Sequence, residues 1–253
     1  MKLRDLTAFL DRELGLEGFS RDLSNNGLQI QGDEEVSSAV FGVDACQALF
    51  EEAARRNAGF VFVHHGLSWG SEPRRFTGIT ARRLELMFRN KISLYAAHLP
   101  LDAHPEFGNN AQLADMVGLR ERLPFFEYDG KKIGFQGILK DDAPGGMISQ
   151  YLAKKLDTEP VFYGDPERAV KKVAIVSGGG GLGALMDASA CGCDLLITGE
   201  FDHTMYHPCQ ELGVGVAVLG HYASETVGPY ALMKKVQAEL GLDAEFVNIP
   251  TGL

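Results

Sequence analysis

The chain has 253 residues, and its 24 lysines and arginines against 34 aspartates and glutamates give a formal net charge of -10. Phosphate groups are bound by an excess of lysine and arginine, so this balance disfavours nucleic acid or an anionic membrane as a main partner. With 45% apolar residues, four cysteines and neither a membrane span nor a signal peptide, the composition predicts a globular cytoplasmic protein without a disulfide scaffold.

Short apolar runs alternate with helical patterns along most of the chain. Apolar residues at helical spacing from Leu3 to Leu14 predict an opening amphipathic helix. Further helices are predicted at 46–56, 79–89, 109–116, 146–156, 183–190, 203–212 and 225–240. Strands are predicted at 28–30, 39–43, 59–63, 92–97, 161–163, 170–176, 193–198, 214–220 and 245–249. This alternation indicates an α/β protein whose mixed sheets are covered by helices.

The stretch from 121 to 143 departs from this pattern. Its Asp129-Gly130 turn between two apolar runs predicts a β-hairpin. We place the domain boundary at this change, which gives an N-terminal α/β domain at 1–123 and a C-terminal one at 124–253. The C-terminal segment could pack back on the first domain.

The two halves resemble one another weakly. Three strand-like runs end in polar residues in each half, first at Asp44, His64 and His98, then at Ser177, Glu200 and His221. The third run of each half also begins a His-x3-acid pair, His98 with Asp102 and His221 with Glu225. Two such matches can arise by chance, so a true repeat and a coincidence both stay open. Ligands in α/β sheets gather beyond the carboxyl ends of strands, where all these residues are expected.

Two adjacent histidines, His64 and His65, end the second run. Successive strand residues point to opposite faces, but at a strand end, followed by Gly66, both rings can reach one crevice. The other candidate ligands are Asp102, His221 and Glu225. Imidazoles with carboxylates suit Zn, Mn, Fe or Co, and five such side chains match two ions roughly 3.5–4 Å apart. The alternative is that one histidine is a satisfied core residue and the other a surface residue.

An ordered set of motifs extends along nearly the whole chain. The set is Asn26-Gly27-Leu28-Gln29, Val63-His64-His65-Gly66 with Trp69-Gly70, His98-Leu99-Pro100-Leu101-Asp102 with Gly108-Asn109-Asn110, Ile197-Thr198-Gly199-Glu200, and Gly220-His221-Tyr222-Ala223-Ser224-Glu225. By these motifs the chain resembles the GTP cyclohydrolase I type 2 homologues, also called the NIF-three-like family.

The resemblance implies a dinuclear metal site in the crevice between two similar α/β domains. The implied ligands are His64, His65, Asp102, His221 and Glu225. It further implies a ring-shaped homohexamer and a small-molecule substrate, with a nucleotide as one form. In the cyclohydrolase version of the chemistry, a metal-activated water attacks C8 of the guanine ring of GTP; a phosphoester version would use the same nucleophile.

Two further residues are predicted near the site. Glu200 ends a strand and is a candidate general base or partner of a ligating histidine, although an ordinary polar helix start explains it equally well. His98 is predicted to orient Asp102, with a role as an extra ligand as the alternative. Arg74 and Arg75 follow the histidines in a loop and could meet an anionic substrate.

The glycine-rich stretch Gly178–Gly183 offers a rival interpretation. It satisfies G-x-G-x-x-G after a strand, and Glu200 follows about twenty residues on, where a ribose-binding acid would lie. The same glycines can instead form a tight turn at the metal crevice. Cys191-Gly192-Cys193 is a weak metal or redox signal, for which a structural role is favoured.

The hypothesis that explains most of these residues is a hydrolase that depends on two divalent metal ions, Zn, Fe, Mn or Co. A protein that binds or handles metal without turnover is the alternative. Neither the substrate nor the metal follows from the ligand types alone.

Overall fold

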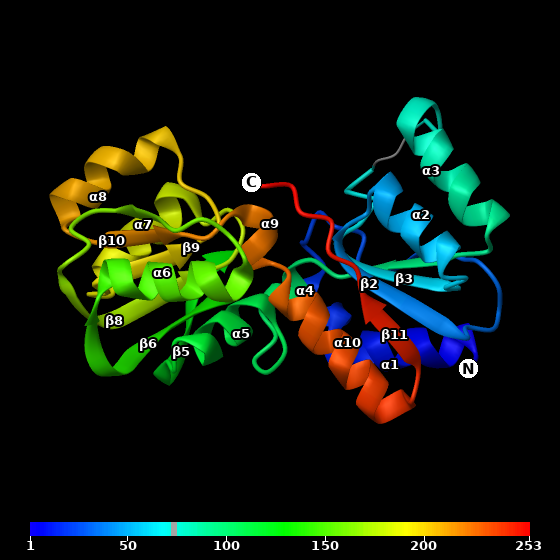
Figure 1. Ribbon diagram of the computed structural model, residues 1–253, viewed down its shortest axis with the longest axis horizontal. Helices are drawn as coiled ribbons and strands as arrows, with labels where there is room; N and C mark the ends of the chain where they lie inside the picture. Colours follow the sequence, from blue (N-terminus) through cyan, green and yellow to red (C-terminus); the bar gives the residue numbers. More distant parts are fainter. Residues whose placement is uncertain (72–74) are drawn as a thin grey trace. The chain divides into compact units, whose positions relative to one another are not determined.

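The computed structural model describes residues 1–71 and 75–253 and divides the chain into two compact units (Figure 1). The first unit comprises Met1–Leu101 and Gly228–Ile249, and the second comprises Asp102–Val227 and Pro250–Leu253. Each unit contains one mixed sheet with helices on its faces. The predicted fold class, α/β with mixed sheets covered by helices, is confirmed.

The sheet of the first unit has five strands, four of them parallel. Their order is β1 (Gly27–Ile30), β4 (Ser93–Ala96), β3 (Phe60–His65), β2 (Ser38–Asp44) and β11 (Asp243–Phe246). Only β1 runs antiparallel to its neighbour within this sheet. Figure 1 shows the helices α1 (Leu3–Leu14) and α10 (Val227–Leu240) on one face, and α2 (Gln47–Arg55) and α3 (Gly78–Arg89) on the other.

Residue alternation along these strands builds a separate core on each face of the sheet. On the α1 face, the rings of Phe41 and Phe62 stack at 5.1 Å and those of Phe62 and Tyr95 at 5.9 Å. The buried Tyr95 hydroxyl donates a hydrogen bond to Asp11 of α1. On the opposite face, Val61 packs in a cluster with Leu49 of α2. The sheet is therefore buried on both faces, which explains its continuous apolar strands.

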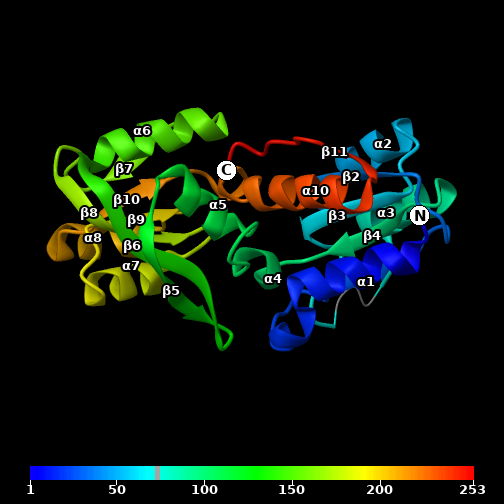
Figure 2. The same ribbon diagram turned by 90° about the horizontal axis from the view of Figure 1, so that it is seen from below.

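The sheet of the second unit has six strands. Their order is β5 (Arg120–Tyr128), β6 (Lys131–Pro144), β8 (Ala169–Val176), β9 (Leu195–Thr198), β10 (Gly215–Val218) and β7 (Val161–Tyr163). The strands β8, β9 and β10 are parallel, and the predicted hairpin forms the antiparallel pair β5 and β6. Figure 2 shows α6 (Gly145–Leu156) on one face, and α7 (Gly181–Ala190) and α8 (Tyr206–Leu212) on the other.

Both units contain three neighbouring parallel strands in chain order, β2-β3-β4 in the first and β8-β9-β10 in the second. The carboxyl ends of such strands lie at the same edge of a sheet. The polar residues at the predicted strand ends are therefore gathered at one edge within each unit.

The division of the chain differs from the boundary at 123/124 that the change of pattern suggested. The second unit begins at Asp102, because α5 (Asn109–Met116) contributes Leu113 and Ala114 to the same core as Ile148 and Val173. The closing segment Gly228–Ile249 belongs to the first unit, where β11 pairs in parallel with β2.

The predicted helix at 225–240 is α10, which begins two residues later, at Val227. The short helix α9 (His221–Ser224) precedes α10, and Glu225 lies between them with a backbone φ of -109°. Pro229 has no N–H to donate to the carbonyl of Glu225, and its ring would clash with that carbonyl in a continuous helix. In the part of the chain that is described, no helix is long and apolar enough to cross a lipid bilayer.

Candidate metal centre

Three histidines of the first unit lie together at the ends of β3 and β4. The ring centroids of His64 and His65 are 4.6 Å apart, and that of His98 lies 5.2 Å from His64 and 5.7 Å from His65. One ligand nitrogen from each ring lies within 4.8 Å of the other two. The adjacent histidines therefore reach one place at the strand end, as the Gly66 turn predicted.

The turn after these histidines is closed by Gln29 from β1. Its Oε1 accepts hydrogen bonds from the backbone N–H groups of Leu67, at 2.8 Å, and Ser68, at 3.1 Å. A side chain at Gly66 would overlap the Gln29 amide, with its Cβ 2.6 Å from Ala96 Cβ. Glycine is therefore required here by close packing, and the Gln29 of the Asn-Gly-Leu-Gln motif holds the histidine turn.

The Nδ1 atom of each histidine in this cluster faces an oxygen that accepts a hydrogen bond. His64 Nδ1 lies 2.9 Å from the carbonyl oxygen of Ala97, and His65 Nδ1 lies 2.8 Å from Asp44. His98 Nδ1 lies 2.9 Å from Asp22. A carbonyl or carboxylate oxygen can only accept, so each Nδ1 carries the proton and each neutral ring has its lone pair on Nε2. This is the tautomer in which a histidine binds a metal through Nε2.

The second unit carries a cluster of one histidine and two acids around α9. His221 Nε2 lies 3.3 Å from Glu225 Oε2, across the i,i+4 spacing that the sequence indicated, and His221 Nδ1 lies 2.6 Å from Glu200 Oε1. The hydrogen bond with Glu225 is the largest influence on the ring and raises the pKa of His221 to about 9 against the effect of burial. Two carboxylates on one imidazole make this a place of strongly negative potential, which suits a cation.

Asp102 ends the short helix α4 (Leu99–Asp102) and is buried in the second unit. Its Oδ1 accepts hydrogen bonds from Asn109 Nδ2, at 2.8 Å, and from Ser177 Oγ, at 3.1 Å. One carboxylate oxygen of Asp102 lies within 4.8 Å of one of Glu225. These two donors fix the plane of the carboxylate beside Glu225.

Asn110 fixes the backbone around Asp102 through three hydrogen bonds. Its fully buried side chain donates to the carbonyl oxygens of Asp102 and Ile133 and accepts the N–H of Ser177, at 3.2, 2.9 and 2.7 Å respectively. The amide thus connects α4, β6 and the end of β8. Asn109 and Asn110 belong to a motif of the sequence, but no local pattern predicted a role for them.

The glycine-rich stretch lies at the same cluster. Gly178 has a φ of +59°, its N–H donates to Ser224 Oγ at 3.0 Å, and its carbonyl accepts the N–H groups of Gly199 and Glu200. A Cβ at position 178 would overlap Glu225 Oε1 and lie 3.2 Å from His221 Nε2. The turn therefore brings backbone against the candidate ligands. Glu200, the acid that a dinucleotide site would need, accepts a hydrogen bond from His221 instead.

Two carboxylates that hold histidines, Asp22 and Asp44, were not predicted as site residues. Asp44 was visible as a polar residue at a strand end, but no motif or spacing in the sequence pointed to Asp22.

Two arginines, Arg74 and Arg75, were suggested as contacts for an anionic substrate. Arg75 is exposed, and Arg74 lies outside the described residues.

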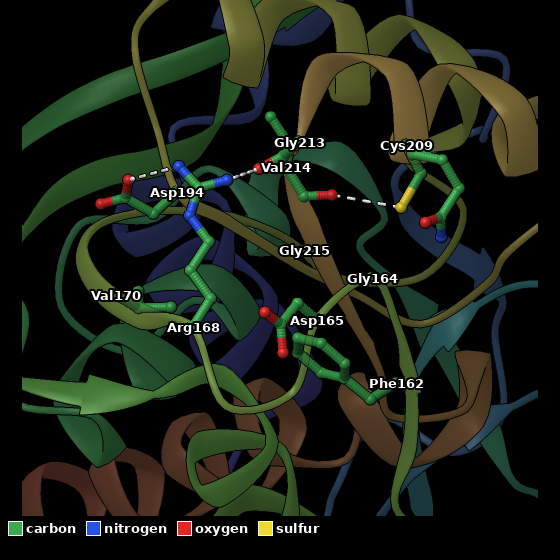
Figure 3. A pocket seen from close by; sticks show the side chains of 11 residues that line it. Phe162, Gly164, Asp165, Arg168, Val170, Asp194, Cys209, Gly213, Val214 and Gly215 are labelled. Atoms are coloured by element: carbon green, nitrogen blue, oxygen red, sulfur yellow. Dashed lines mark hydrogen bonds and ion pairs between the residues drawn. The ribbon is translucent and has the colours of Figure 1, made fainter.

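A small cavity of about 130 Å³ lies at the other edge of the second sheet, where β8, β9 and β10 begin (Figure 3). Several of its polar groups are paired with each other. Arg168 donates to the carbonyl of Gly213 and forms an ion pair with Asp194 at 3.8 Å, and Cys209 donates to the carbonyl of Val214 at 3.1 Å. These contacts join the strand starts and explain the cavity as part of the packing.

The cysteine pair at 191 and 193 is arranged around one amide. Gln136 Nε2 lies 3.7 Å from Cys191 Sγ, and its Oε1 lies 3.9 Å from Cys193 Sγ. Both cysteines are free thiols that contact the same residue of β6, which favours the structural role.

Cys193 is expected to resist alkylation in the folded protein. Burial raises the pKa of the Cys193 thiol to about 11, and only the thiolate reacts. At pH 8 we expect Cys46 and Cys191, which are partly exposed, to be modified about a hundredfold faster than Cys193. Mass spectrometry of iodoacetamide-treated protein checks this, and the rate at Cys193 should rise as the pH approaches 11. Equal rates at pH 8 would contradict it.

The fold and the two clusters define an α/β protein with histidine and carboxylate metal-ligand candidates at the carboxyl ends of its parallel strands. A model of the family described as Duf34/NIF3 (NGG1p interacting factor 3) matches residues 1–251. The chain belongs to this family.

Relatives and solved structures agree with this membership over the full length. Proteins from Archaeoglobus fulgidus and Pyrococcus abyssi, each named GTP cyclohydrolase 1 type 2 homolog, are 45% and 43% identical to it, with 100% of both chains covered. A structure of a protein called ybgI, described as of unknown function, is 37% identical with a TM-score of 0.92. The crystal structure of TTHA1606 from Thermus thermophilus is 35% identical with a TM-score of 0.88, and both comparisons cover 100% of each chain.

Proposed function

We propose that the protein is a metal-dependent hydrolase in which His64, His65, Asp102, His221 and Glu225 bind two divalent ions. The observation that carries the proposal is the arrangement of His64, His65 and His221, whose Nδ1 atoms all face an oxygen acceptor. An oxygen acceptor on the far ring nitrogen is the usual environment of a metal-binding histidine.

The donor set also fits the metals. Imidazole nitrogens together with carboxylate oxygens suit Zn, Fe, Mn or Co rather than Mg or Ca. When bound, a pair of such ions supplies Lewis acidity and lowers the pKa of water to about 7, which provides a nucleophile at neutral pH.

The residues of the chain then have distinct tasks. Glu200 orients His221 through the hydrogen bond to Nδ1, while Asn109 and Ser177 orient Asp102. His98 is the proposed acid–base group, because it is the third imidazole of the first-unit cluster and is not among the five ligands. Glu200 is the other candidate for moving a proton.

A nucleotide is the proposed class of substrate, with ring opening of GTP as the specific form. This follows from the name that the relatives from Archaeoglobus fulgidus and Pyrococcus abyssi carry. A protein that binds metal without turnover is the competing proposal, since the same ligands serve both. Reconstitution with each metal, followed by assays on GTP, other nucleotides and simple phosphoesters, separates the two, and the absence of any turnover would favour the second.

Replacing Glu225 with alanine is expected to remove at least one of the two ions. Glu225 is buried beside both His221 and Asp102, which are the other two candidate ligands in the second unit. Elemental analysis of the purified variant measures the loss. Glu211→Ala, which removes an exposed glutamate of α8, is the matched control and should keep the metal content of the wild type. Full occupancy in Glu225→Ala would refute the ligand assignment.

A cytoplasmic location stays a prediction from the sequence.

The resemblance and the family membership also support a homohexamer. Static light scattering at micromolar concentration is expected to give about six times the chain mass of 27.5 kDa. A monomer under these conditions would contradict the proposed assembly.

A further inference from the structure

Asp22 is a buried carboxylate at the base of the histidine cluster of the first unit. Its side chain is 1% exposed, and it lies in the segment between α1 and β1. Oδ1 accepts hydrogen bonds from His98 Nδ1, at 2.9 Å, and from the N–H of Ser24, at 3.0 Å. Oδ2 accepts from Asn26 Nδ2, at 2.8 Å, and from the N–H of Leu99, at 3.1 Å. Both oxygens are therefore occupied by fixed donors.

Asn26 binds both to Asp22 and to the backbone of His98, and we call Asp22 and Asn26 together the His98 clamp. Its Oδ1 accepts the backbone N–H of His98 at 2.8 Å, while its Nδ2 donates to Asp22. The ring of His98, its backbone and the N–H of the next residue are thus all held by two side chains four positions apart. The ring also packs edge-on against Trp69, with centroids 5.0 Å apart.

The other carboxylate partner in this cluster is placed differently. Asp44, which faces His65, has a side chain that is 36% exposed, so water competes for its oxygens. Burial alone would raise the pKa of Asp22, but the hydrogen bonds that it accepts from His98, Asn26 and Ser24 hold it below its usual range. Asp22 stays ionised although it is removed from water.

We propose that Asp22 is a positioning residue, which with Asn26 holds the His98 ring in one orientation and one tautomer beside the His64–His65 pair. Nδ1 carries the proton that Asp22 accepts, so Nε2 keeps the lone pair that a proton acceptor in the site needs. The acid–base role of His98 rests on the proposed function, whereas the clamp itself rests only on these contacts.

The test is nitrogen-15 spectroscopy of the imidazoles in the full-length protein labelled at histidine, with the His98 signals assigned from His98→Gln. In the wild type, we expect His98 as a single Nδ1–H tautomer. In Asp22→Asn the ring loses its carboxylate acceptor and should become a mixture of tautomers, while the signals of His221 stay unchanged. Asp33→Asn, which removes an exposed acid paired with Lys91, is the control and should leave His98 as in the wild type.

A wild-type His98 in the Nε2–H form would overturn the proposal. This measurement needs no variant, so the proposal can be tested even if Asp22→Asn does not fold. An unchanged single tautomer in a folded Asp22→Asn protein would overturn it as well. Where turnover is found, Asp22→Asn should lower kcat about a hundredfold with both metal ions retained. Metal loss in Glu225→Ala tests the proposed function separately. The proposed metal site and the proposed role of Asp22 can therefore be refuted independently of each other.

Discussion

Replacing Gly178 with alanine is expected to weaken metal binding by about 10- to 100-fold, as changes next to metal ligands typically do. The new Cβ would overlap Glu225 Oε1 and lie 3.2 Å from His221 Nε2, so the carboxylate must move away from the histidine. The backbone around the turn is fixed by the hydrogen bonds of Gly178 to Ser224, Gly199 and Glu200, and cannot move aside easily. Titration with zinc or cobalt, followed by elemental analysis, measures the loss.

Gly192→Ala is the matched control for this substitution. Gly192 also has a left-handed backbone, with a φ of +68°, but nothing lies within 4 Å of a Cβ built there. Both variants therefore carry the cost of about 1 kcal/mol or more for a side chain in this conformation, and only Gly178→Ala disturbs a candidate ligand. Equal metal affinities in the two variants would show that Glu225 does not bind metal in the way proposed.

Asn110→Ala is expected to lower the free energy of unfolding by about 3–5 kcal/mol. The substitution removes the partners of three backbone groups, the carbonyls of Asp102 and Ile133 and the N–H of Ser177. Each group left buried without a partner costs about 1–3 kcal/mol, and the side chain of Asn110 is itself fully buried. Urea unfolding at pH 7.5 with metal removed measures the change.

Gln112→Ala on the same helix provides the comparison. Its amide donates a single hydrogen bond, to the carbonyl of Glu106 at 2.7 Å, in an exposed setting. We expect this variant to lose about 1 kcal/mol or less. A loss of that size in Asn110→Ala too would mean that the three backbone groups find other partners.

Local patterns in the chain were sufficient to predict most of the fold. The amphipathic helix α1, the succession of strands and helices, and the hairpin at β5 and β6 were all predicted. Each of these features depends on residues close together in the sequence. The short helix α9, which ends just before α10, was not predicted. The place of β11 beside β2 could not be inferred from periodicity, since pairing of distant strands is a tertiary choice.

Some features of the candidate site could likewise be predicted from the sequence, and others could not. The chain by itself determined which side chains could bind metal, because histidines and acids at strand ends are local features and strand ends share one edge of a sheet. Only the tertiary structure decided what surrounds them. Asp22 reaches His98 across 76 positions of sequence, and Glu200 reaches His221 across 21. Gly178 is a glycine because Glu225 occupies the space of its side chain. Hydrogen bonds and excluded volume act over a few ångströms in space, so contacts between segments far apart in the sequence leave no spacing or periodicity from which they could be predicted.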